Sequence, residues 1–287
     1  MQFFNDAISY DFLQRAILTA LLASAACGVL GAYIVARRNS YMLGAVSHSL
    51  LGGIGLALFC QNALGLAFFT PFCGAILAAL LVSTAITFLT ARKNAREDTV
   101  LSAVWTAGVA IGLCFVAAIP GYSVDLNSYL FGNILMVSTT ELCLMLLLDA
   151  LILPLTFLFH SRFLAYCFNE EGLTLRGVSP LRTAWLLNIL TGLAIVLLSQ
   201  TVGIVMVLAL MVLPAAAAAK ISRTLPQIML LGTLFCLISC LAGMALSYAP
   251  EWPVGAVIIL VAGFIYIVAA TISYAIEAHQ TRHKQPL

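Results

Sequence analysis

One histidine lies inside a long apolar segment of this 287-residue chain. His48 follows the adjacent arginines Arg37 and Arg38 and belongs to the run Tyr41–Cys60, which contains no Asp, Glu, Lys or Arg. An ionisable side chain inside hydrocarbon is costly, so it normally faces a bundle interior or a water-filled path. His48 is therefore a candidate functional residue, and the alternative is a neutral histidine hydrogen-bonded to a neighbouring helix.

A carboxylate in a second apolar segment is the other candidate. Asp149, in the run LMLLLDALILP, is the only other ionisable group well inside a predicted membrane span. Because a carboxylate in hydrocarbon is costly, Asp149 is also a candidate functional residue. The alternative is a carboxylic acid that is protonated because it is buried, or hydrogen-bonded across helices.

The elements that position these residues are membrane helices. Hydrophobic residues make up 63% of the chain and charged residues 8%, and the mean hydropathy is +1.09, which excludes an ordinary soluble domain. Nine runs are long enough to cross about 30 Å of hydrocarbon. They are Phe12–Ala36, Tyr41–Cys60, Leu66–Thr90, Val100–Ile119, Leu142–Phe159, Leu181–Ser199, Val202–Ala219, Ile228–Tyr248 and Val254–Ala275. The sequence predicts an all-α polytopic membrane protein with about nine transmembrane helices, within a range of eight to ten.

The basic residues predict the orientation of the chain. Twelve of the 13 lysines and arginines fall in alternate loops and in the C-terminal tail, 277–287. The opposite loops carry Asp125, Glu141 and Glu251 and no basic residue. By the positive-inside rule the N-terminus lies outside and the C-terminal tail is cytoplasmic. The segment Gly121–Thr140 is too short in its apolar part to span, so we expect either a re-entrant or interfacial element or a loop lying on other helices.

Small residues and a proline predict tight packing. Gly52 and Gly53, one turn beyond His48, allow another backbone to approach that helix. Pro214 removes a backbone hydrogen bond from its helix and is expected to bend it. Gating hinges use the same features, so we regard all three as packing or hinge positions.

The sequence disfavours an enzyme. Ser47 and Ser49 flank His48, but adjacent residues on a helix point about 100° apart and do not share a hydrogen bond easily. No HExxH or GxSxG pattern occurs, and no nucleotide-binding glycine loop is present. A secondary transporter driven by a proton or sodium gradient, with Asp149 as the titrating group, remains an alternative.

Four motifs together resemble a known family. Arg37–Tyr41 leads to His48, and three further motifs follow in order: Val124–Leu126 with Tyr129–Gly132, Val202–Ala217, and Pro253–Gly255. This arrangement is similar to the membrane permease subunits of bacterial metal-ion ABC importers, which take up zinc, manganese or iron. The resemblance implies a type II-like importer fold over the single domain 1–287. A siderophore or vitamin ABC permease is a further alternative.

The resemblance also implies partners. The permease would pair with a second copy or a sister permease, with two cytoplasmic ATPase subunits, and with an extracytoplasmic metal-binding protein. It would lie in the bacterial inner membrane among lipids and bind no nucleic acid. The chain itself would not be an enzyme, would hold no permanent cofactor, and would carry the divalent ion as its cargo.

The resemblance assigns coupling to the loop 161–182, where the family carries a short helix that fits a cleft on the ATPase. Asn169 is a suitable N-cap, and Glu170 and Glu171 suit a first helical turn, which Gly177 and Pro180 would end. The expected coupling residues are Glu170, Glu171, Gly172, Arg176 and Gly177. The alternative is a surface helix without a partner.

The chain departs from the family pattern beside its histidine. The family places an aspartate four residues before it, and Gly44 occupies that position here. Gly44 and Ser47 are then expected to line the pathway next to His48. The resemblance implies that His48 is a ligand of the transported metal ion, and a divalent cation that has shed its water also needs several donors and some negative charge. Three explanations of the missing acid remain open: a weak transit site, another acid such as Asp149, which would then be the second metal ligand, or a carboxylate from a sister permease.

Overall fold

The computed structural model describes residues 6, 9–91, 96–119, 132, 134–250 and 252–283, and within them it contains only helices. Nine helices in these ranges are long and apolar enough to span a membrane. They are α2 (Asp11–Arg37), α3 (Ser40–Leu64), α4 (Pro71–Thr90), α5 (Glu97–Ala117), α7 (Thr139–Leu158), α10 (Pro180–Thr201), α11 (Ile204–Ile221), α12 (Leu225–Tyr248) and α13 (Val254–His283). Three short helices accompany them: η1 (Ile134–Met136), α8 (His160–Phe168) and α9 (Glu170–Leu175). The predicted all-α fold with about nine spans is confirmed.

The predicted third span began five residues too early. α3 continues to Leu64 and ends at Gly65, whose φ of 69° places it in the left-handed region that favours glycine. α4 begins only at Pro71, because the Thr70 hydroxyl accepts a hydrogen bond from the Cys73 amide and proline suits the first helical position. The residues between them form the connection.

Some predictions concern residues outside the described ranges. These are Asp125, Glu251, most of the segment Gly121–Thr140, and the side chains of the tail from residue 277 onward.

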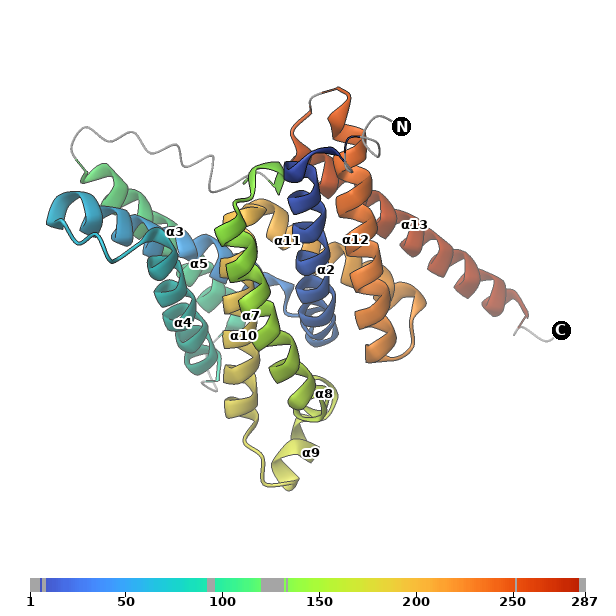
Figure 1. The fold of residues 1–287 in the computed structure, drawn as a ribbon. Helices are drawn as coiled ribbons and strands as arrows, with labels where there is room; N and C mark the ends of the chain where they lie inside the picture. The colour runs from blue at the N-terminus through green and yellow to red at the C-terminus, as the bar shows by residue number, and fades with distance from the viewer. Residues whose placement is uncertain are drawn as a thin grey trace. The chain divides into compact units, whose positions relative to one another are not determined.

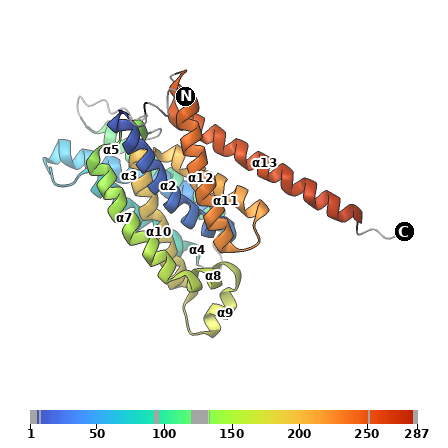
Figure 2. The same ribbon diagram turned by 45° about the vertical axis from the view of Figure 1, so that its right-hand side comes forward.

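The helices form two compact units. The first unit comprises residues 1–36, 134–137 and 209–287, and the second comprises 37–133 and 138–208. In the second unit α3 packs against α4 and α5, and α10 packs against α4, α7, α3 and α8 (Figure 1). Figure 2 shows α8 and α9 beyond the lower ends of α7 and α10. This unit holds both candidate metal ligands and the predicted coupling loop.

Glycine pairs set the spacing of the helix that carries His48. A Cβ atom on Gly52 would lie 2.9 Å from the carbonyl oxygen of Gly108 in α5, and one on Gly53 would overlap the carbonyl oxygen of Gly74 in α4. Such contacts are closer than real Cβ atoms allow, so only glycine permits these backbones to approach. α3 is therefore held tightly between two neighbouring helices.

The first unit is organised by small residues and thiols. α12 packs against α13, and a Cβ atom on Gly28 in α2 would overlap Thr233 in α12. The buried Cys236 thiol is within hydrogen-bonding contact of those of Cys27 and Cys240. Pro214 lies inside α11, which continues past it to Ile221.

Candidate functional site

The His48 imidazole in α3 is half-buried and stacks on the Trp105 indole of α5. The two ring centroids are 4.5 Å apart and the planes differ by 9°. Offset stacking of this kind contributes about 0.5–1.5 kcal/mol beyond the area it buries. One face of the imidazole is therefore covered, while its ring nitrogens remain at the edge of the stack.

Gly44 lies one turn before His48 and faces the same indole. A Cβ atom on Gly44 would be 2.8 Å from Trp105 Cζ3. The indole thus occupies the space that a larger side chain at position 44 would need. Ser47, the other predicted pathway residue, is fully buried, and its hydroxyl has no hydrogen-bond partner among the described residues.

Asp149 is deeply buried in α7. Its side chain is 3% exposed, and neither carboxylate oxygen has a hydrogen-bond partner within the described part of the chain. α7 packs against α10 and α8, whereas α3 packs against α5, α4 and α10. His48 and Asp149 thus lie on two helices that both pack against α10.

The structure does not bring His48 and Asp149 together with a third ligand. Among the described residues, no three or more His, Cys, Asp or Glu side chains are arranged to hold a metal ion. A stable transition-metal site usually needs three or four ligands.

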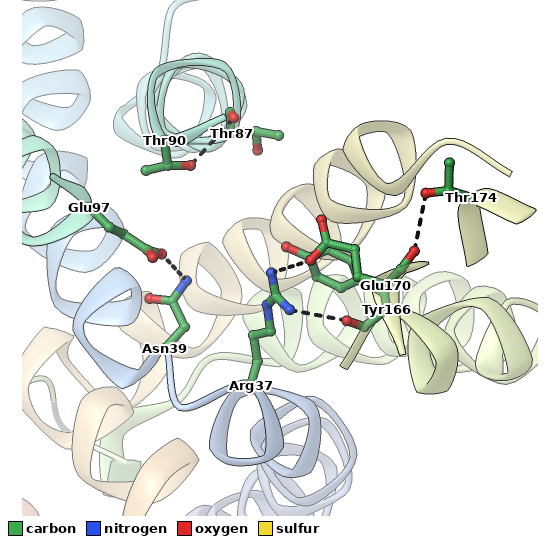
Figure 3. Close-up of polar contacts among 8 residues, drawn as sticks. All are labelled: Arg37, Asn39, Thr87, Thr90, Glu97, Tyr166, Glu170 and Thr174. Atoms are coloured by element: carbon green, nitrogen blue, oxygen red, sulfur yellow. Dashed lines mark hydrogen bonds and ion pairs between the residues drawn. The ribbon is translucent and has the colours of Figure 1, made fainter. Parts of the chain in front are cut away.

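At the end of the second unit that carries α8 and α9, a single arginine joins several elements (Figure 3). Arg37 Nη2 forms an ion pair with Glu170 Oε2 at 3.0 Å. Arg37 Nη1 donates to the Tyr166 carbonyl oxygen at 3.2 Å, and the guanidinium carbon lies 4.2 Å from the centre of the Tyr166 ring. The arginine just before α3 is thereby connected to both α8 and α9.

The α9 helix has the local structure that the sequence predicts. The Asn169 carboxamide oxygen accepts a hydrogen bond from the Gly172 amide at 2.8 Å, which caps the helix. Glu170 and Glu171 occupy the first turn, and Gly177, with φ of 73°, follows the last turn. Leu173 is buried under the helix, whereas Leu175 is 89% exposed.

A polar cavity of about 440 Å³ lies beneath this end of the second unit. Arg37, Glu170 and Tyr166 line one side, and Thr87 and Thr90 of α4 line another (Figure 3). Asn39 Nδ2, also in the lining, donates to Glu97 Oε1 at 2.9 Å and so joins the start of α3 to the start of α5. Residues at or next to the ends of several helices, among them α3, α4, α5, α8 and α9, therefore line this one cavity.

The sequence did not reveal Trp105 or Tyr166 as participants. Each packs against a residue far away along the chain, and a lone aromatic residue in an apolar helix carries no pairing signal. A search for aromatic residues on neighbouring helices at the depth of His48 would have found the first of them.

The described residues contain nine helices that are long and apolar enough to cross a membrane, as in a multi-pass membrane protein. The family model described as ABC 3 transport family matches residues 9–273. A probable metal transport system membrane protein of Chlamydia pneumoniae is 37% identical, covering 91% of this chain and 89% of the relative. The manganese transport system membrane protein MntC of Halalkalibacterium halodurans is 33% identical, covering 93% and 89%.

A solved structure agrees with these relatives. PsaBC from Streptococcus pneumoniae in complex with Fab is 28% identical, with a TM-score of 0.81 over 93% of this chain and 94% of that one. The chain belongs to the ABC 3 transport family and is an ABC-type metal transport permease.

Proposed function

We propose that this chain is the membrane-spanning subunit of an importer that moves a divalent transition-metal ion, manganese or iron in the first instance, into the cytoplasm by alternating access. The observation that carries the proposal is the ion pair between Glu170 of α9 and Arg37. Arg37 is the last residue of α2 and stands three residues before α3, the helix of His48. In this proposal a displacement of α9 is transmitted through Arg37 and the short connection after it to the start of α3.

In this proposal a separate ATPase supplies the energy for transport. α9 presents Leu175 to a cytoplasmic partner, while Asn169 and the buried Leu173 fix the shape of the helix. ATP binding by that partner pushes on α9 and changes the balance between outward-open and inward-open states. Glu171, Gly172, Arg176 and Gly177 belong to the same contact surface.

His48 and Asp149 contact the passing ion. An imidazole suits manganese, iron and zinc, and a carboxylate offsets part of the charge of a dehydrated cation. Trp105 covers one face of the His48 ring, and because an imidazole binds an ion through lone pairs in the ring plane, this stack does not block ion binding. A site with so few donors releases its ion readily, as transport requires.

The relatives support two further partners. A second permease, identical or a sister chain, completes the pathway, and an extracytoplasmic metal-binding protein delivers the ion. The N-terminus lies outside and the α8–α9 end faces the cytoplasm, as the basic residues indicate.

One observation favours a rival mechanism driven by an ion gradient. The buried carboxylate of Asp149 has no hydrogen-bond partner among the described residues, and isolated intramembrane carboxylates commonly carry protons in transporters. Such a transporter would use Asp149 for proton binding and would need no ATPase.

Uptake of radioactive manganese into proteoliposomes separates the two mechanisms. The permease is reconstituted with and without its ATPase subunits, and ATP or a protonophore is added. The proposal expects uptake only with ATPase and ATP, insensitive to the protonophore. Uptake that persists without ATP and disappears with the protonophore contradicts the proposal and supports the rival.

A further inference from the structure

A second cavity in the second unit is lined by two arginines and by aromatic side chains. It measures about 410 Å³ and lies where α7 ends and α10 begins. We call it the arginine pocket. Its principal lining residues are Phe159, Arg162, Gly177, Ser179, Arg182 and Trp185.

The charge of the arginine pocket is entirely positive. No carboxylate lines it, and neither Arg162 nor Arg182 forms an ion pair within the described residues, where the only pair is that of Arg37 with Glu170. The Arg162 guanidinium lies 5.1 Å from the centre of the Phe159 ring, which holds it against the wall. Two unneutralised guanidinium groups beside one cavity attract an anion with several oxygen acceptors.

The remaining wall is apolar and continues toward the membrane. Trp185 is 39% exposed, and its indole Nε1 donates to Thr84 Oγ1 at 3.1 Å, which fixes the ring at the pocket edge. Phe159, Phe163 and Leu186 also line the cavity and, together with Trp185, form what we call the apolar strip. The apolar strip and the two guanidinium groups therefore border one cavity at the end of the spans, the level at which tryptophan is enriched in membrane proteins.

We propose that the arginine pocket binds the phosphate headgroup of an anionic phospholipid. Arg162 and Arg182 contact the phosphate oxygens, and Trp185 and Leu186 lie against the glycerol and the upper part of the acyl chains. A soluble anion would use the arginines but not the apolar strip, whereas a phospholipid uses both. Basic pockets between membrane helices bind headgroups in this way.

The experiment measures lipid retention by the full-length chain. The protein is placed in nanodiscs of phosphatidylcholine with or without phosphatidylglycerol, and retained lipid is counted by native mass spectrometry after extraction. The double variant R162Q/R182Q is compared with K220Q/R223Q, which removes two exposed positive charges at the end of α11 that are not part of the pocket. R162K/R182K keeps the charge and serves if the glutamine variant does not fold.

We expect phosphatidylglycerol retention to be roughly 25-fold weaker in R162Q/R182Q, at about fivefold per lost arginine near a membrane surface. Retention in K220Q/R223Q and in R162K/R182K stays within about threefold of the original protein. Equal retention in both glutamine variants overturns the proposal. Displacement of the lipid by inorganic phosphate at the same concentration also overturns it, because the pocket would then bind a soluble anion.

Discussion

Polar groups near the start of α3 and two polar groups inside the spans differ in whether they have hydrogen-bond partners. Where α3 begins, Arg37, Asn39 and Glu97 are paired with partners on other helices. In the span, the Ser47 hydroxyl and the distant Asp149 carboxylate are buried with no partner among the described residues. Burying an unpaired polar group costs free energy, whereas pairing it fixes a position. In the function that we propose, the paired groups transmit movement and the unpaired groups face the passing ion.

We expect the largest effect from a substitution that forces α3 away from α4. We expect Gly53→Leu to abolish folding, because even a Cβ atom there overlaps the Gly74 carbonyl oxygen, and overpacking costs about 3 kcal/mol or more. Fluorescence-detected size exclusion after heating measures the folded fraction. Gly263→Leu is the matched control, since nothing lies within 4 Å of a Cβ atom at that position. Equal folded fractions in the two variants would show that the close approach of α3 and α4 is not required.

A second prediction concerns the Trp105 indole that stacks on His48. We expect Trp105→Ala to raise the rate at which diethylpyrocarbonate modifies His48 by about fivefold, because loss of the stack removes about 1 kcal/mol of protection. Peptide mass spectrometry follows the reaction, with His160 as the internal reference. Trp252→Ala, which removes an indole that is 61% exposed, controls for a general effect. An unchanged His48 rate means that the indole does not cover the ring in the membrane.

A third prediction concerns the ion pair between Arg37 and Glu170, whose loss should have a smaller effect. We expect Glu170→Gln to reduce ATP-driven metal uptake about threefold, since a partly exposed ion pair contributes roughly 0.2–1 kcal/mol. Arg37→Gln should have a similar effect, and the double variant should be no worse than either single variant. Asp98→Asn, which removes an exposed acid in the first turn of α5, is the control. A loss in Asp98→Asn as large as that in Glu170→Gln argues against a specific connection through Arg37.

A fourth prediction concerns the reactivity of a thiol near Arg37. Burial raises the pKa of the Cys167 thiol to about 11, against the opposing influence of Arg37. Because the thiolate is the reactive form, maleimide labelling of Cys167 should be slow at neutral pH and rise about tenfold per pH unit through pH 9. A protein that retains only Cys167 and the exposed Cys73 allows both rates to be measured together. A Cys167 rate that levels off below pH 9 contradicts a buried thiol at this position.

The sequence predicted what local physics determines. The apolar runs predicted nine spans because a helix must be long enough to cross hydrocarbon, and Asn169 with Glu170 predicted α9 because capping is a local interaction. The predicted start of α4 was wrong because Thr70 and Pro71 determine where the helix begins more strongly than hydrophobicity does.

The sequence did not predict contacts between residues that are far apart along the chain. Arg37 and Glu170 are 133 positions apart, and their pairing depends on how α8 and α9 fold back beside α3. The sequence likewise showed that position 44 carries no acid, but it did not show that Trp105 occupies the adjoining space. Both facts follow from the packing of whole helices rather than from any spacing along the chain.

The most direct test of the account is metal uptake by the complete transporter carrying His48→Ala. His160→Ala, in α8 outside the spans, is the matched control, and equal amounts of folded protein are compared. If His48 contacts the passing ion, uptake of radioactive manganese or iron falls at least roughly tenfold in His48→Ala and stays near the original rate in His160→Ala. Unchanged uptake of manganese, iron and zinc in His48→Ala would contradict the account.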